Sequence, residues 1–205
     1  NGKDGKPFKT REGGVMRLEN LIADIDEEMF TKIVENRSVR DKDARDTAKI
    51  VGLAAIKYGD LSNQATKDYI FDVDRFTSFE GNTGPYILYT IVRIKSILNR
   101  YVEAGGNLEA GEILPASNGS EKNLMLQLSG FGSMIESAFE EKAPHKICAY
   151  IYEVSNAFNS FYHETKILSE ENQAQKESYI RLLQLTKRVL ETSIDLLGFE
   201  APDKM

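Results

Sequence analysis

The chain has 205 residues, of which 41% are hydrophobic and 28% charged, and its formal net charge is −6. This composition excludes a largely disordered chain and is typical of a globular protein with a packed core. No apolar run approaches the roughly 18 residues of a membrane-spanning helix, and the lone cysteine, Cys148, excludes an internal disulfide. We therefore expect a cytosolic protein with no membrane partner.

The acidic balance argues against general nucleic-acid binding, which requires clustered lysines and arginines. Charge is unevenly distributed, however. Residues 1–17 are basic, whereas the acidic excess lies in the middle of the chain. A surface that binds RNA would have to be local, and binding by this chain alone is expected to be weak and sensitive to salt.

Apolar side chains recur at helical spacing through the first 60 residues. One stripe predicts a helix over 18–36: Leu18, Leu21, Ile22, Ile25, Met29 and Ile33. A second stripe predicts a helix that ends near Gly59 and packs closely against a neighbour: Ala44, Ala48, Val51, Ala55 and Tyr58. Residues 68–79 show no sustained period and are expected to be extended or irregular.

A third helix is introduced by the turn at 81–84, with Pro85 at its first position. Its stripe is Ile87, Ile91, Ile94, Leu98 and Tyr101. Residues 104–120 are rich in Gly, Ser and Asn and predict a long surface connection.

Three further helices complete the prediction. The fourth carries Leu124, Leu128, Phe131 and Ile135, and the fifth, with Pro144 near its start, carries Ile147, Ile151, Val154, Phe158 and Phe161. The last covers 173–197, and Gly198 stops it. Because no strand pattern competes, we predict an all-α bundle of six helices.

Four separated stretches carry a more specific signal. They are GKDGKPFKTREGG at 2–14, GNTGPYILYTIVR at 81–93, APHKICAYIYEVSNAFNSFYHE at 143–164 and LLGFEAPDKM at 196–205. Together and in this order they resemble the bacterial-type arginyl-tRNA synthetases of class I. The resemblance implies the C-terminal part of such an enzyme, with residues 1–80 as the helical tail of the catalytic domain and 81–205 as the all-helical anticodon-binding domain.

The segment KPFKT at 6–10 lies where the family carries its KMSKS loop. The resemblance implies that Lys6 and Lys9 contact the phosphates of ATP, a role that suits lysines in a Gly-flanked loop. Pro7 and Phe8 depart from the family motif. Without the resemblance, the segment would be interpreted as a solvated basic tail.

Tyr86, Tyr89 and Arg93 lie on one side of the predicted third helix, away from its apolar stripe. Aromatic rings beside a guanidinium can stack on unpaired bases and hold a phosphate. The alternative is that both tyrosines pack under a neighbouring helix and Arg93 pairs with an acid. Core packing is as reasonable as RNA binding for the tyrosines, and Arg93 is the better functional candidate.

The resemblance adds three residues to the candidate tRNA contacts. Tyr162 and the terminal Met205 match family positions close to the anticodon loop. Lys166, one helical turn after Tyr162, occupies a position where some relatives carry an aromatic residue, and it could contact phosphate instead.

The remaining polar candidates have structural interpretations. We expect no metal site at His145 and His163, because no acidic or thiol pattern of ligands accompanies them. Asn82 and Gly84 are expected to form a turn. The two aspartates of 72–74 have no partner motif and are expected to be solvated or ion-paired.

The resemblance implies that the full-length parent, an arginine–tRNA ligase, joins L-arginine to its tRNA with ATP and Mg²⁺. This chain shows no HIGH-type motif, so we expect it to be inactive alone, to hold no cofactor and to retain a role in tRNA selection as a monomer. Two other classes are considered. A helical protein-interaction scaffold would show a contiguous apolar groove and no tRNA affinity, and an independent metabolic enzyme would need a convergent set of titratable groups, which the sequence does not show.

Overall fold

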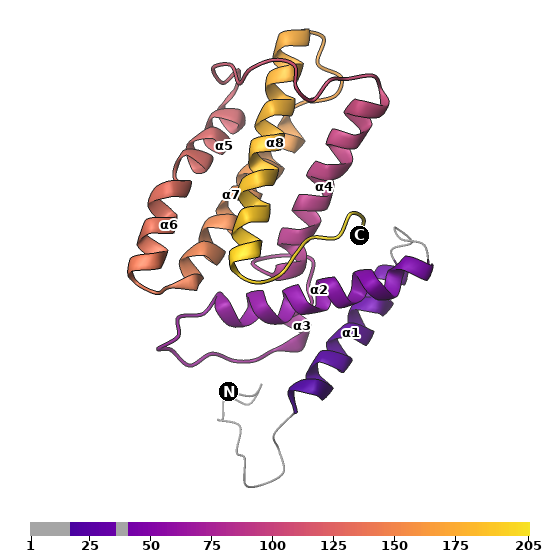
Figure 1. Cartoon of the computed structure of the whole chain (residues 1–205), viewed down its shortest axis with the longest axis vertical. Helices are drawn as coiled ribbons and strands as arrows, with labels where there is room; N and C mark the ends of the chain where they lie inside the picture. Colours follow the sequence, from indigo (N-terminus) through magenta and orange to yellow (C-terminus); the bar gives the residue numbers. More distant parts are fainter. Residues whose placement is uncertain (1–16, 36–40) are drawn as a thin grey trace. The chain divides into compact units, whose positions relative to one another are not determined.

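The computed structural model describes residues 17–35 and 41–205, and within these ranges it contains eight α-helices and no β-strand (Figure 1). The chain divides into two compact units. The first unit comprises Asn1–Tyr89 and Leu197–Met205, and the second comprises Thr90–Leu196. None of the helices in the described ranges combines the length and apolar character that a bilayer crossing requires.

The first unit is built on a pair of helices, α1 (Leu18–Glu35) and α2 (Asp41–Leu61), which pack against each other. Their predicted stripes form the contact, and eight of these side chains are buried: Ile25, Met29, Ile33, Ala44, Ala48, Val51, Ala55 and Tyr58. Burying a large apolar side chain contributes about 1.5–3 kcal/mol. The two predicted helices are therefore confirmed, with ends shifted by one or two residues.

Residues 68–79 are irregular except for a single helical turn, α3 (Val73–Phe76), which the sequence did not predict. Asp72 is its N-cap, and the Asp72 side chain accepts hydrogen bonds from two backbone N–H groups of the turn. Asp72 thus caps this turn, a role that the sequence did not predict. Thr77 follows the turn, fully buried, and its hydroxyl donates to Glu28 at 2.6 Å and accepts from Lys32 at 2.8 Å, which ties α3 to α1.

The first turns of α4 (Gly84–Glu103) approach α2 so closely that no side chain fits between the two backbones. A Cβ atom placed on Gly84 would lie 2.3 Å from the carbonyl oxygen of Ala54. We predicted Gly84 as a turn former. Its position requires glycine for a different reason, helix–helix contact, and Gly81 is the residue of this turn with positive φ, at 81°.

The C-terminal segment, Leu197–Met205, returns to the first unit. Gly198 ends the preceding helix with φ of 80°, as predicted, and its carbonyl accepts a hydrogen bond from the Lys57 ammonium at 2.5 Å. Leu197, Phe199 and Pro202 are buried. The segment is therefore packed as part of the first unit.

The second unit contains the rest of α4 and the helices α5 (Gly119–Ser129), α6 (Phe131–Glu140), α7 (Pro144–Glu164) and α8 (Gln173–Leu196). Helix α7 packs against α5, α6 and α8, and Figure 1 shows α5 and α6 following each other along one side of this group. The predicted stripe of α4 is buried throughout, and Pro144 is at the N-terminus of α7. These parts of the prediction are confirmed.

The predicted fourth helix is wrong in one respect, because it is two helices. Gly130 separates α5 from α6 and serves as the C-cap of one and the N-cap of the other. Glycine is a poor helix former because its backbone loses more freedom on ordering than that of other residues. The apolar spacing across Gly130 remains helical, and for this reason periodicity alone did not show the break.

The end of the long connection is more ordered than predicted. Asn118 caps α5 by accepting a hydrogen bond from the backbone N–H of Glu121 at 2.8 Å. The Glu121 carboxylate is fully buried and accepts from the backbone N–H of Ser117 at 2.6 Å and from its hydroxyl at 2.8 Å. The Ser117 hydroxyl also lies 2.9 Å from that of Tyr179, which joins this cap to α8.

Candidate functional site

Arg93 of α4 and Tyr162 of α7 come together in the second unit. The Arg93 guanidinium carbon lies 5.1 Å from the centre of the Tyr162 ring, within the range of a cation–π contact. Asn159 accepts a hydrogen bond from Arg93 at 2.5 Å, and its amide nitrogen lies 3.3 Å from the hydroxyl of the buried Thr90. Residues from two helices thus orient one guanidinium over one aromatic ring.

The ring of Tyr162 rests on a buried side chain of the same helix, α7. Phe158, one turn earlier on the same helix face, is fully buried, and its ring stacks on that of Tyr162 with centroids 6.1 Å apart. The Tyr162 side chain is itself 36% exposed, and its hydroxyl has no hydrogen-bond partner among the residues that the structure describes. The site therefore presents a fixed aromatic ring and a cation at the surface, the groups that bind unpaired bases and phosphates.

The other predicted contacts are distributed over the two units. Lys166 is exposed just after the end of α7, in the same unit as Arg93 and Tyr162. Tyr86, Tyr89 and Met205 belong to the first unit, where Tyr89 is 41% exposed and the other two are half-buried. The predicted core packing therefore fits the half-buried Tyr86, whereas the exposure of Tyr89 does not fit it.

Lys6 and Lys9, predicted to contact ATP, lie outside the described residues.

Asn159 and Thr90 were missed by the sequence analysis. Asn159 precedes Tyr162 by three residues and Thr90 precedes Arg93 by three, a spacing that places each pair on one helix face. The sequence of each helix alone therefore predicts that its two residues share a face. The hydrogen bonds that join Asn159 to Arg93 and Thr90 could not be predicted, because they depend on how α4 lies against α7.

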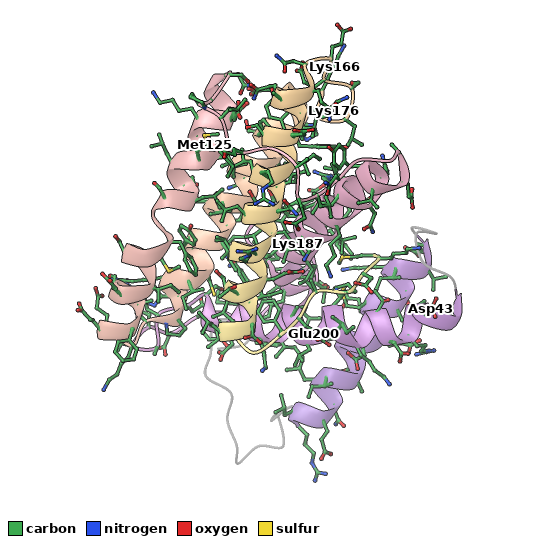
Figure 2. All side chains as sticks on the ribbon, turned by 45° about the horizontal axis from the view of Figure 1, so that its top comes forward. Asp43, Met125, Lys166, Lys176, Lys187 and Glu200 are labelled. Atoms are coloured by element: carbon green, nitrogen blue, oxygen red, sulfur yellow. The ribbon has the colours of Figure 1, made fainter. Side chains whose placement is uncertain are left out.

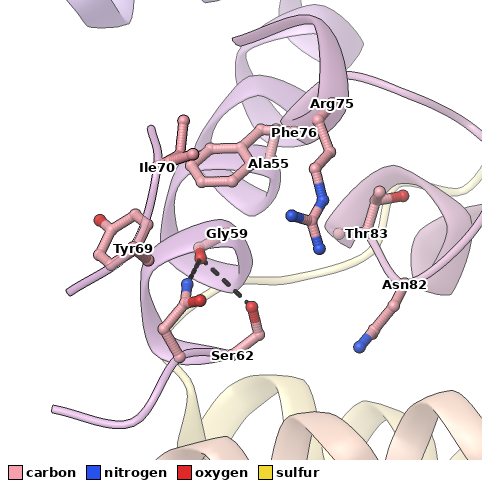
Figure 3. Close-up of a pocket in the computed structure, with 11 residues that line it drawn as sticks. Ala55, Gly59, Ser62, Tyr69, Ile70, Arg75, Phe76, Asn82 and Thr83 are labelled. Atoms are coloured by element: carbon pink, nitrogen blue, oxygen red, sulfur yellow. Dashed lines mark hydrogen bonds between the residues drawn. The ribbon is translucent and has the colours of Figure 1, made fainter. Parts of the chain in front are cut away.

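A small pocket in the first unit is lined by polar groups (Figure 3). The Arg75 guanidinium points into it, and the Gly59 carbonyl on its wall accepts hydrogen bonds from Asn63 at 2.6 Å and Ser62 at 3.2 Å. Its volume is about 40 Å³, enough for one or two water molecules but not for a nucleotide base. We therefore assign it no part in RNA binding.

His145 is half-buried and His163 is exposed on α7, and within the described ranges no three His, Cys, Asp or Glu side chains are arranged to hold a metal ion. Cys148 is fully buried, and burial raises the pKa of its thiol to about 12. The thiolate is the reactive form of cysteine. The interpretation of Cys148 as a small buried thiol is therefore supported by its position in α7.

We expect the Cys148 thiol of the folded chain to react negligibly with a disulfide reagent such as DTNB at mildly alkaline pH. Both its burial and its raised pKa suppress the thiolate, and denaturant should restore the reaction. The measurement is the absorbance of the released thiolate. The double variant Cys148→Ala/Ala149→Cys, which moves the thiol to an exposed neighbour, should react in the folded state. Rapid labelling of the folded wild type would contradict this account.

Comparison with known proteins shows the family to which the chain belongs. Residues 87–205 match the model of the DALR anticodon binding domain, and residues 1–73 match that of the catalytic domain of class I tRNA synthetases (R). The chain is 67% identical over 213 residues to the arginine–tRNA ligase of Agathobacter rectalis, and 56% identical over 205 residues to that of Alkaliphilus oremlandii. Both matches cover 100% of this chain but only 36% and 35% of those proteins.

Solved structures give the same result. The arginyl-tRNA synthetase of Thermus thermophilus is similar with a TM-score of 0.85 and 26% identity over 94% of this chain and 33% of that protein. The enzyme of Plasmodium falciparum is similar with a TM-score of 0.81 and 27% identity over 93% of this chain and 34% of that protein. The chain thus spans about a third of the length of these relatives. It belongs to the arginyl-tRNA synthetase family, and its residues 87–205 are a DALR anticodon-binding domain.

Proposed function

We propose that residues 81–205 recognise the anticodon arm of arginine tRNA. The observation that carries this proposal is the pairing of Arg93 with Tyr162 on the surface of a domain whose family is defined by anticodon binding. A ring that is anchored on the core and half in solvent can stack on an unpaired base at little cost in side-chain entropy. A neighbouring guanidinium can hold the phosphate of the same nucleotide.

Each candidate residue has a role under this proposal. Tyr162 stacks on a base, and Arg93 binds phosphate or a base edge from the position that Asn159 gives it. Lys166 contacts phosphate. Three residues of the first unit are proposed to make the same kind of contact: Tyr86 and Tyr89, from their place on the face of α4, and Met205, from the resemblance.

We further propose that residues 1–80 are the tail of a class I catalytic domain in a longer parent enzyme. Support comes from the match of residues 1–73 to that catalytic domain and from the share of the relatives that this chain spans. The parent would attach L-arginine to its tRNA in the cytoplasm as a monomer, with ATP as a substrate and Mg²⁺. Lys6 and Lys9 would contact the ATP phosphates. Anticodon binding would help to align the distant acceptor end with the active site.

The alternative is a protein-interaction scaffold that does not bind RNA. One observation favours it, since Phe139 on α6 is 82% exposed and Leu126 on α5 is 61% exposed. Single exposed apolar side chains are common on proteins, however, and they do not by themselves mark an interface. Absence of any tRNA binding would favour the scaffold.

Replacing Tyr162 with alanine is expected to weaken binding of arginine tRNA by roughly tenfold or more, because stacking of one base on an aromatic ring is worth about 1–3 kcal/mol. Binding of a non-cognate tRNA should change little. The measurement is filter binding of both tRNAs to the 205-residue chain. Tyr162→Phe, which keeps the ring, should bind like wild type.

The matched control is Phe139→Ala, which removes an exposed ring from α6 and should leave tRNA affinity unchanged. Equal retention of the two tRNAs by the wild type would contradict the proposed recognition, as would an unaltered affinity of Tyr162→Ala.

A further inference from the structure

A groove in the second unit is formed where three segments meet. These are the C-terminal end of α4 with the glycine turn that follows it, the connection between α7 and α8, and the first turn of α8. Its volume is about 240 Å³, and its walls include Arg100, Tyr101, Gly106, Leu168, Gln173 and Lys176. It is an open cleft large enough for a phosphate group and part of a sugar.

The charged side chains that line this groove are all positive. Arg100 and Lys176 are the charged residues of its wall, and no carboxylate is among its lining residues. Across the part of the chain that the structure describes, neither side chain forms an ion pair or a side-chain hydrogen bond. The chain as a whole carries an acidic excess, so two unpaired cations facing one cleft are not a result of average composition.

Helix stability explains only one of these cations. Arg100 lies in the last turn of α4, where a positive charge interacts favourably with the helix dipole. Lys176 lies in the first turn of α8, where a positive charge is unfavourable and an acidic residue is preferred. The dipole of α8 therefore does not account for Lys176 at this position.

We infer that this groove binds a backbone phosphate of the same RNA, beyond the bases that the Arg93 and Tyr162 pair contacts. The inference rests on the proposed function. Arg100 follows Arg93 by two helical turns, so the Cα atoms of the two arginines lie on nearly the same side of α4, about 10 Å apart along its axis. Lys166 lies two residues before Leu168 of the groove wall, and Figure 2 shows Lys166 and Lys176 at the same end of the unit.

The sequence of the RNA should not matter at this site. Arginine and lysine that contact phosphate position a nucleic acid but read no base. The groove therefore supplies affinity and orientation, whereas the discrimination between tRNAs comes from the Arg93 and Tyr162 surface.

The test is filter binding of arginine tRNA and a non-cognate tRNA over a range of salt concentrations, with the variant Arg100→Gln/Lys176→Gln. Each phosphate contact contributes about 0.7–0.9 to the slope of log affinity against log salt. We expect the slope to fall by roughly 1.5 and the affinity at low salt to fall about tenfold, equally for both tRNAs. The ratio of the two affinities should stay as in the wild type.

The matched control is Lys122→Gln/Arg188→Gln, which removes one lysine and one arginine from exposed positions outside the groove in the same unit. A groove variant that behaves like this control would overturn the inference, as would one that loses selectivity without a change of slope. In that case the proposed function still stands if Tyr162→Ala loses selectivity. If the wild type does not distinguish the tRNAs but the groove variant lowers the slope, the proposed function fails and the phosphate site remains.

Discussion

Substituting alanine for Gly84 is expected to destabilise the first unit by about 3 kcal/mol, because overpacking against a backbone cannot be relieved by a change of rotamer. The new Cβ would lie 2.3 Å from the carbonyl oxygen of Ala54 and 2.6 Å from its carbonyl carbon, far inside van der Waals contact. The start of α4 would have to move away from α2. Urea denaturation of the 205-residue chain, followed by circular dichroism, would measure the loss.

Gly119→Ala is the matched control. Gly119 is also the first residue of a helix, α5, but a Cβ there meets no atom within 4 Å. This variant should be within about 0.5 kcal/mol of wild type or slightly more stable, because alanine favours helix more than glycine does. Equal midpoints for the two variants would show that the close approach of α2 and α4 does not constrain residue 84.

Replacing Glu121 with alanine is expected to destabilise the second unit by about 2–3 kcal/mol. The buried carboxylate accepts both hydrogen bonds of Ser117, and a hydrogen bond to a charged group is worth about 1.5–3 kcal/mol. Its removal leaves the Ser117 N–H without this partner and weakens the link to Tyr179. The measurement is again the free energy of unfolding in urea.

Two variants sharpen this test. Glu121→Gln keeps the volume and one acceptor oxygen, so its loss should lie between those of wild type and Glu121→Ala. Glu136→Ala removes an exposed carboxylate from α6 and should change stability by less than about 0.5 kcal/mol. Similar losses for Glu121→Ala and Glu136→Ala would mean that burial of Glu121 contributes little to the fold.

The helices were predictable because periodic apolar residues must share one face to be buried together. The stripe from Ile25 to Ile33 needed only the order of residues in one segment, and so did the stop at Gly198. The break at Gly130 was missed because the apolar spacing continues across it. The single turn at 73–76 was missed because it is too short to show a period.

The candidate site was predictable in its residue types but not in its partners. Helical spacing predicted Arg93, and the resemblance predicted Tyr162. Their contact, and the bond from Arg93 to Asn159, could not be predicted because they depend on how α4 lies against α7. Glu121 was missed for a different reason. The spacing from Asn118 to Glu121 is that of a helix cap, yet it lies at the end of a segment that was interpreted as surface loop.

The C-terminal segment has a practical consequence for work with isolated parts of the protein. Residues 197–205 pack with the first unit, so the second unit is inserted into the first rather than appended to it. Expression of the region 87–205 alone would separate Gly198 from Lys57 and would remove most of the first unit, with which residues 197–205 pack. A fragment of residues 90–196 would not contain this C-terminal segment, and it would therefore also lack Met205.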